Sequence, residues 1–163
     1  MRFYPTIKPF RPAASSPPTT TWRFFRWAVQ GAWPGILWAT FWSAASGSME
    51  AISATLLGDV IDVANSANPA TVFSDHLWLF VGFVGLYLVA RPLIFGLTTH
   101  AASIIVEPNL FPLILSRMHR WTLGQAVTFF DNDFAGRIAQ KQMQVARAAT
   151  DVVSGSIETM AFS

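Results

Sequence analysis

The chain has 163 residues, of which 52% are hydrophobic and only 12% are charged, about half the charged fraction of an average soluble domain. This composition argues against an ordinary water-soluble surface, and the absence of cysteine excludes disulfides and thiolate metal sites. Five of the eleven basic residues lie in the first 26 positions, five lie after residue 116, and Arg91 stands alone between them. Basic clusters that abut apolar segments are typical of cytoplasmic flanks, so we expect no nucleic-acid partner.

Residues 1–21 carry five of the ten prolines, with Ser and Thr between them. This composition predicts a disordered or polyproline-like cytoplasmic tail. Residues 22–30 (WRFFRWAVQ) then mix aromatic and basic side chains. They predict a short interfacial helix in the headgroup plane, or else the interfacial aromatic belt of the next helix.

Two long apolar stretches follow, and each exceeds the roughly 20 residues that cross a bilayer. Residues 27–58 contain one charged residue, Glu50, and residues 76–106 contain Arg91 as the only clear charge. We predict transmembrane helices over 33–58 and 76–121, the second with a cytoplasmic extension. The connector 59–75 has three aspartates and no Lys or Arg, which places it outside and both chain ends inside. A soluble all-helical domain would have too little polar surface with this sequence.

Small residues recur every four positions in the first apolar stretch, at Ser43, Gly47, Ala51 and Thr55. This spacing favours close approach of another helix. Glu50 and Arg91 are costly in lipid and should face protein, water or each other. They are a possible intramembrane polar site, and we expect a structural or interface role rather than contact with a substrate.

The apolar pattern of the second stretch continues past Pro108 and Pro112, which predicts a kinked helix reaching into the cytoplasm. Residues 134–151 favour a further helix. Residues 152–163 become apolar again and look like the start of a third transmembrane helix. We therefore expect the chain to be a fragment of a larger protein.

Motifs for catalysis, nucleotide binding and metal binding are absent from the sequence. It has no G-x-x-x-x-G-K-[ST] loop, and His76, His100 and His119 lack the spacing of a zinc site on a helix. Asp131 and Asp133 stand in a turn-like segment without further carboxylates. We expect no catalytic, cofactor or metal site in this chain, which by itself is not an enzyme.

The segment 128–142 (TFFDNDFAGRIAQKQ) resembles the first intracellular loop of ABC exporters, the type-1 transmembrane domains of ABC transporters. The resemblance covers residues 22–163 and implies an all-α membrane protein. In order it comprises an elbow helix, two long transmembrane helices, an intracellular loop with a coupling helix over 129–150, and the start of a third transmembrane helix. It assigns contact with a nucleotide-binding domain to seven residues: Phe129, Phe130, Asp131, Asp133, Phe134, Gly136 and Arg137.

The resemblance further implies an ATP-driven transporter in a bacterial inner membrane, built as a dimer of halves. The partners of this segment are the lipid bilayer, the remaining transmembrane helices and a nucleotide-binding domain of the same or a second chain. ATP and Mg²⁺ would bind in that domain. For residues 129–137 the alternative is an amphipathic turn that packs on its own bundle. For the whole chain it is a small non-catalytic membrane scaffold or assembly subunit that binds partner helices.

Overall fold

The computed structural model describes residues 6–66, 71–125 and 135–162, and these ranges contain helices and connecting segments but no strand. An extended segment, residues 6–20, leads into α1 (Thr21–Ala28) and α2 (Trp33–Ser66). A short helix, α3 (Val72–Asp75), precedes one continuous helix that comprises α4 (Leu77–Gly85), η1 (Leu86–Ala90), α5 (Arg91–His100), η2 (Ala101–Val106) and α6 (Glu107–Leu123). The last element is α8 (Ala135–Phe162). The prediction of a helical chain is confirmed.

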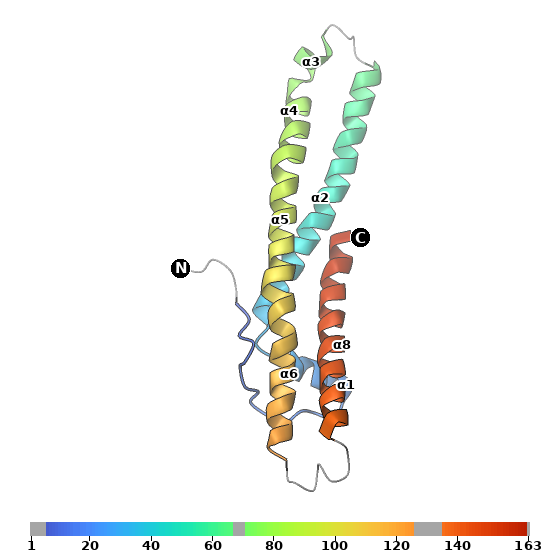
Figure 1. The fold of residues 1–163 in the computed structure, drawn as a ribbon. Helices are drawn as coiled ribbons and strands as arrows, with labels where there is room; N and C mark the ends of the chain where they lie inside the picture. Colours follow the sequence, from blue (N-terminus) through green and yellow to red (C-terminus); the bar gives the residue numbers. More distant parts are fainter. Residues whose placement is uncertain (1–5, 67–70, 126–134, 163) are drawn as a thin grey trace.

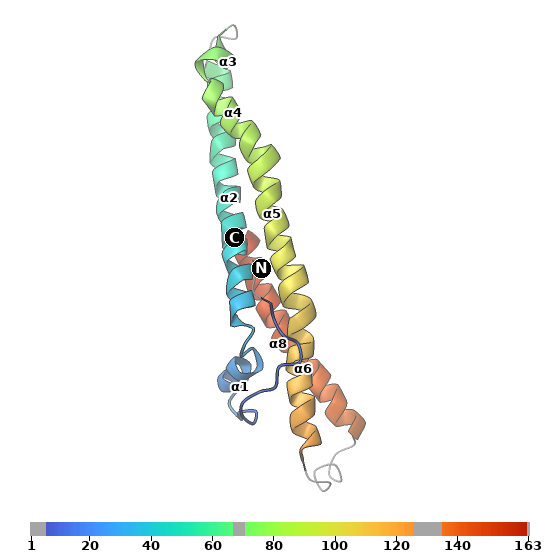
Figure 2. The ribbon, with the colours of Figure 1, turned by 90° about the vertical axis from the view of Figure 1, so that its left-hand side faces the viewer.

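The long helices form an antiparallel hairpin with a third helix beside its lower half (Figure 1). α8 packs on both α2 and α6, and α1 lies across the foot of the bundle (Figure 2). The hydrophobic core sits at this lower end, where α2, η2, α6 and α8 meet. Its members include Ile36, Ala39, Ile105, Leu110, Leu113, Ile114, Ala146, Val153 and Ile157. In contrast, α3, α4, η1 and α5 contain no buried residue.

The continuous helix widens into π-helical turns at two places, η1 and η2, and a proline follows each of them: Pro92 after η1 and Pro108 after η2. A proline ring clashes with the carbonyl four residues earlier and offers that carbonyl no N–H, and a π turn relieves both problems. The Asn109 side chain donates hydrogen bonds to the carbonyls of Ile104 and Ile105, at 3.2 and 3.0 Å. The helix therefore continues past Pro108 without a break, and the kink that the sequence predicts near Pro108 and Pro112 stays a prediction.

Arg117 of α6 is buried at 3% exposure and connects three parts of the chain. Its guanidinium donates hydrogen bonds to the carbonyls of Trp27 and Ala28, both at 2.9 Å, and to that of Gln30 at 2.6 Å. Its Nε donates to the carbonyl of Arg11 at 3.1 Å. The last carbonyls of a helix have no partner within the helix, so Arg117 caps α1 and fixes the tail beside it.

The structure differs from the predicted disordered tail over residues 6–20. Ile7 is buried and lies so close to Gly35 that a Cβ added there would stand 2.8 Å from the Ile7 side chain. The Ser116 hydroxyl donates to the carbonyl of Pro9 at 3.1 Å, and the Trp27 indole donates to that of Ser15 at 2.9 Å. Prolines lack an N–H but keep their carbonyl, and the helices supply the donors that hold this segment.

The predicted and observed helices differ most at the first predicted crossing. The sequence predicts a helix over 33–58, whereas α2 continues to Ser66. α1 covers 21–28 against a predicted 22–30, and the continuous helix covers 77–123 against 76–121. Residues 135–162 form one helix. The predicted helix 134–151 and the predicted start of a third transmembrane helix are therefore parts of one continuous helix.

One helix of the described chain, Leu77–Leu123, is long and apolar enough to cross a membrane. α2 is also long enough to cross a membrane, but its small and polar residues lower its mean hydropathy. By length and hydropathy together it does not qualify as a membrane-spanning helix. Two crossings therefore stay a prediction.

We predict that Arg117→Met destabilises the fold by about 3 kcal/mol, because it leaves buried carbonyls without donors. Chemical unfolding in detergent micelles measures the loss, and chymotrypsin should then cut the freed tail after Phe10 faster than in the wild type. Arg120→Met removes an exposed arginine three residues on and should change stability by less than about 0.5 kcal/mol. Equal losses for the two variants would contradict the capping role.

Candidate functional site

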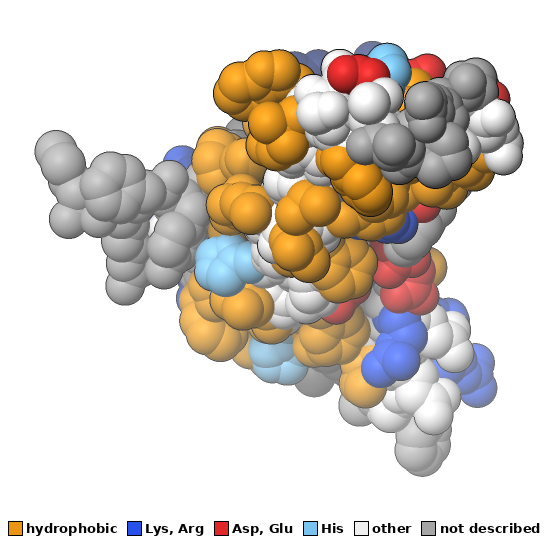
Figure 3. Space-filling view, turned by 90° about the horizontal axis from the view of Figure 1, so that it is seen from above, with side chains coloured by type: hydrophobic (Ala, Val, Ile, Leu, Met, Phe, Trp, Pro, Cys, Tyr) orange, Lys and Arg blue, Asp and Glu red, His pale blue; other side chains and the backbone are white. Residues whose placement is uncertain are grey.

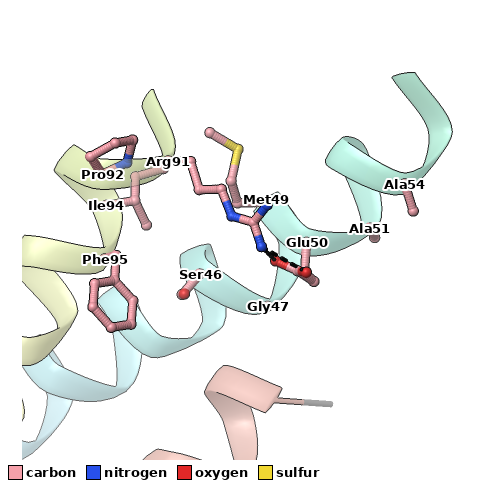
Figure 4. Close-up of a pocket in the computed structure, with 10 residues that line it drawn as sticks. All are labelled: Ser46, Gly47, Met49, Glu50, Ala51, Ala54, Arg91, Pro92, Ile94 and Phe95. Carbon is pink, nitrogen blue, oxygen red and sulfur yellow. Dashed lines mark hydrogen bonds and ion pairs between the residues drawn. The ribbon is translucent and has the colours of Figure 1, made fainter. Parts of the chain in front are cut away.

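A groove of about 790 Å³ lies between α2 and α5, in the part of the hairpin above the core. The α2 wall consists mainly of small side chains, and the α5 wall carries the larger ones (Figure 4). The lining residues are Ser46, Gly47, Met49, Glu50, Ala51, Ala54, Arg91, Pro92, Ile94 and Phe95. The groove thus contains both residues of the predicted intramembrane polar site.

Glu50 and Arg91 form an ion pair across the groove. The Arg91 Nη2 donates to both carboxylate oxygens of Glu50, at 2.9 Å to Oε1 and 2.8 Å to Oε2. The Arg91 guanidinium carbon also lies 5.4 Å from the ring centroid of Tyr87, one helical turn earlier. This distance permits a cation–π interaction. Glu50 thus neutralises the charge of Arg91, and the Tyr87 ring adds a second favourable contact to it.

The length of α2 explains why the two residues meet. If the first helix ended at Gly58, as the sequence predicts, Glu50 would lie only eight residues from the connector, whereas Arg91 lies much further from it along the second helix. The eight further residues to Ser66 add about 12 Å to α2 at 1.5 Å per residue. Glu50 is then sixteen residues from the end of α2, and Arg91 is fourteen from Leu77. The pairing is a consequence of this register.

Both side chains remain accessible, with 67% of the Glu50 side chain and 41% of the Arg91 side chain exposed. In water such a pair would contribute about 1 kcal/mol or less. In an apolar medium the same contact matters more, because either charge alone would be costly there. The other lining residues are uncharged, so the groove suits packing or recognition rather than bond-making chemistry.

The small-residue face of α2 is largely uncovered by the described chain. Ser43 is buried and Gly47 is half-buried, whereas Ala44, Ser48, Ala51 and Thr55 are exposed. The hydroxyls of Ser48 and Thr55 donate to the carbonyls four residues earlier, both at 2.9 Å. Hydroxyls satisfied in this way leave a smooth surface that a helix or lipid can approach without loss of hydrogen bonds.

Most of the predicted coupling residues, Phe129, Phe130, Asp131, Asp133 and Phe134, lie outside the described residues. Gly136 and Arg137 are in the first turn of α8, and both are exposed. A Cβ added at Gly136 would meet nothing within 4 Å.

Two polar residues that the sequence reasoning did not single out connect α8 to α6. The Gln142 amide donates to the Thr122 hydroxyl, and both side chains are buried. The buried position of Arg117 could have been predicted from the spacing of apolar residues before it. It follows Leu110, Leu113 and Ile114 at helical spacing, so it shares their buried face.

The three histidines are spread along the chain: His76 lies at the tip of the hairpin, His100 at the end of α5 and His119 in α6. Among the residues that the structure describes, no group of three or more His, Cys, Asp or Glu side chains could hold a metal ion.

The sequence is similar to an uncharacterized ABC transporter ATP-binding protein from Haemophilus influenzae. The two are 29% identical over 147 residues, which cover 87% of this chain and 24% of the relative. The chain thus spans about a quarter of the length of that relative. Neither a protein-family model nor a solved structure matches the sequence. The similarity relates the chain to ABC transporters.

We predict that exchanging the two charges preserves the groove. Glu50→Arg or Arg91→Glu alone places like charges opposite each other and should lower the amount of folded protein in membranes several-fold. The double variant restores the pair and should recover most of that loss, as measured by fluorescence size-exclusion chromatography of detergent extracts. Combining Arg91→Glu with Glu107→Arg is the control, since Glu107 lies well away in α6, and it should not rescue. Rescue by the control alone would contradict a specific pair.

Proposed function

We propose that the chain is the N-terminal part of the transmembrane domain of an ATP-driven ABC exporter. In this proposal α2 and the continuous helix 77–123 form part of the substrate path. In the same proposal, residues 129–150 are the first intracellular loop with its coupling helix, which passes movement of a nucleotide-binding domain to that path. ATP and Mg²⁺ bind in the nucleotide-binding domain, outside this chain.

The uncovered apolar surface of the hairpin supports a membrane location. None of the most apolar part of the helix 77–123 is buried in the structure, and Trp78 is 84% exposed. Further exposed apolar side chains include Leu88, Val89, Leu93 and Phe95 on this helix and Leu37, Phe41 and Ile52 on α2. Hydrophobic side chains cover much of the surface seen from the tip of the hairpin (Figure 3). Such a surface needs lipid or partner helices around it.

The length of the helix 77–123 supports a role in transmission, and this observation carries the proposal. Its 47 residues extend about 70 Å at 1.5 Å per residue, whereas the hydrocarbon core is about 30 Å thick. The end that contains α6 packs on α8 through the core and through the Thr122 and Gln142 side chains. A stiff helix pair of this kind can carry a displacement from its end to the groove at Glu50.

The exposed small-residue face of α2 is the observation that favours the second candidate, a membrane scaffold that binds partner helices. Ala44, Ser48 and Ala51 offer such a helix a close approach. A transporter also surrounds its first helix with other helices, so this face suits both candidates. The similarity to an ABC transporter protein favours the exporter.

We predict that the connector is extracellular and the foot of the bundle cytoplasmic. Because the chain has no cysteine, Ser74→Cys near the hairpin tip and Ala139→Cys in α8 each introduce a single thiol at an exposed site. A membrane-impermeant maleimide should label Ser74→Cys in intact cells and Ala139→Cys only after permeabilisation. Labelling of both in intact cells, or of neither, would contradict two crossings.

We further predict that Gly136→Pro or Phe130→Ala in the complete transporter leaves ATP binding intact but reduces substrate-stimulated ATP hydrolysis about tenfold. A proline at 136 disfavours a helical conformation of Ala135, the residue before it, and so changes how α8 begins. The alanine removes an aromatic side chain that the proposal assigns to the contact with the nucleotide-binding domain. Met143→Ala, an exposed change further along α8, is the matched control and should retain stimulation. Unchanged stimulation in Gly136→Pro would count against this position of the coupling helix.

A further inference from the structure

The outward face of α1 combines one aromatic and two basic side chains. Trp22 is 72% exposed and stacks on Phe25 with ring centroids 6.2 Å apart. Arg23 and Arg26 are exposed beside Trp22, whereas Ala28 on the opposite face is buried, as is Trp27 between the two faces. α1 contains no acidic residue. An exposed Trp beside two arginines is the arrangement that amphipathic helices present to lipid headgroups.

A small apolar notch lies beside this face, where α1, α2 and α8 meet. Its volume is about 130 Å³, and its walls come from Phe25 and Val29 of α1, Trp33, Ile36 and Thr40 at the start of α2, and Val153, Ser156, Ile157 and Met160 of α8. No charged side chain lines it. Arg26 lies three residues before Val29, and Trp22 three before Phe25, so each is a helical neighbour of a wall residue.

We infer that this notch and the outward face of α1 together form a binding site for one anionic phospholipid of the cytoplasmic leaflet. The headgroup phosphate contacts Arg23 and Arg26, and part of an acyl chain enters the notch.

The size and position of the notch select this occupant. It is several times larger than the roughly 30 Å³ of one water molecule, but far too small for a helix about 10 Å across. α1 lies at the end of the bundle opposite the aspartate-containing connector (Figures 1 and 2). With the orientation proposed above, that end is cytoplasmic, where anionic headgroups and arginines complement each other. The inference therefore rests on the proposed membrane role.

The consequence for the protein is that a lipid can influence the same helix end that Arg117 caps. Arg117 itself does not contact the headgroup, because its guanidinium is buried and already donates hydrogen bonds to the carbonyls of Trp27, Ala28 and Gln30. The charges of α1 that are available to a headgroup are those of Arg23 and Arg26. A lipid bound at α1 is thereby connected to α6 through the side chain of Arg117.

The test uses the full chain reconstituted in vesicles of phosphatidylglycerol and phosphatidylcholine in equal parts, followed by detergent extraction and mass spectrometry of the retained lipid. The wild type should retain phosphatidylglycerol over phosphatidylcholine by about tenfold, and Arg23→Gln with Arg26→Gln should bring the two to near parity. Ser156→Phe fills the notch and should reduce retention of both lipids. Arg120→Gln with Arg147→Gln removes the same charge from other exposed sites and should leave the preference unchanged.

Carbonate extraction of the same vesicles separates the two ways of failing. If the chain stays in the membrane and shows no preference, or if the control pair abolishes the preference equally, the lipid site is overturned while the membrane role stands. If carbonate removes the chain from the vesicles, the membrane role itself fails.

Discussion

The lower end of this molecule depends on a single buried guanidinium. Arg117 donates hydrogen bonds to the carbonyls at the end of α1 and to the carbonyl of Arg11, which would otherwise need water as a donor. It thereby joins α6, α1 and the segment 6–20. The contact joins α6 to the end of α1, to the turn before α2 and to residues 6–20, which Ser116 and Trp27 also hold. Gly31 makes the turn into α2 possible, because its φ of +85° is accessible mainly to glycine.

Above this unit the chain is a hairpin without a core, and its stability must come from its surroundings. In the proposed membrane location, lipid would surround the apolar side chains but leave charges unpaired, so the pairing of Glu50 with Arg91 would allow the groove to lie inside the bilayer. The Thr98 hydroxyl adds one polar contact between the helices, with the carbonyl of Trp42 at 2.9 Å. The two long helices are therefore joined at a few polar points, and the groove between α2 and α5 stays open.

Periodicity and composition predicted the helices of the chain well, since long apolar runs without turn signals leave the backbone few alternatives. The ends were less predictable. α2 passes Gly58 and Asp59 because a glycine costs a helix only about 1 kcal/mol. The packing of residues 6–20 could not be predicted, because proline-rich composition describes a segment by itself. In the structure Ile7 lies against Gly35, and the carbonyls of Pro9 and Arg11 accept hydrogen bonds from Ser116 and Arg117, 107 and 106 residues along the chain.

By itself, the sequence determined the helical class, the apolar character of the hairpin and the two residues of its polar site, because each follows from which side chains are present and how they are spaced. Only the tertiary structure decided which of them meet. The partners of Glu50, Arg117 and Gln142 lie 41, up to 106 and 20 residues away. Contacts over such separations depend on helix length and register, which accumulate along the chain and leave no local signal in composition.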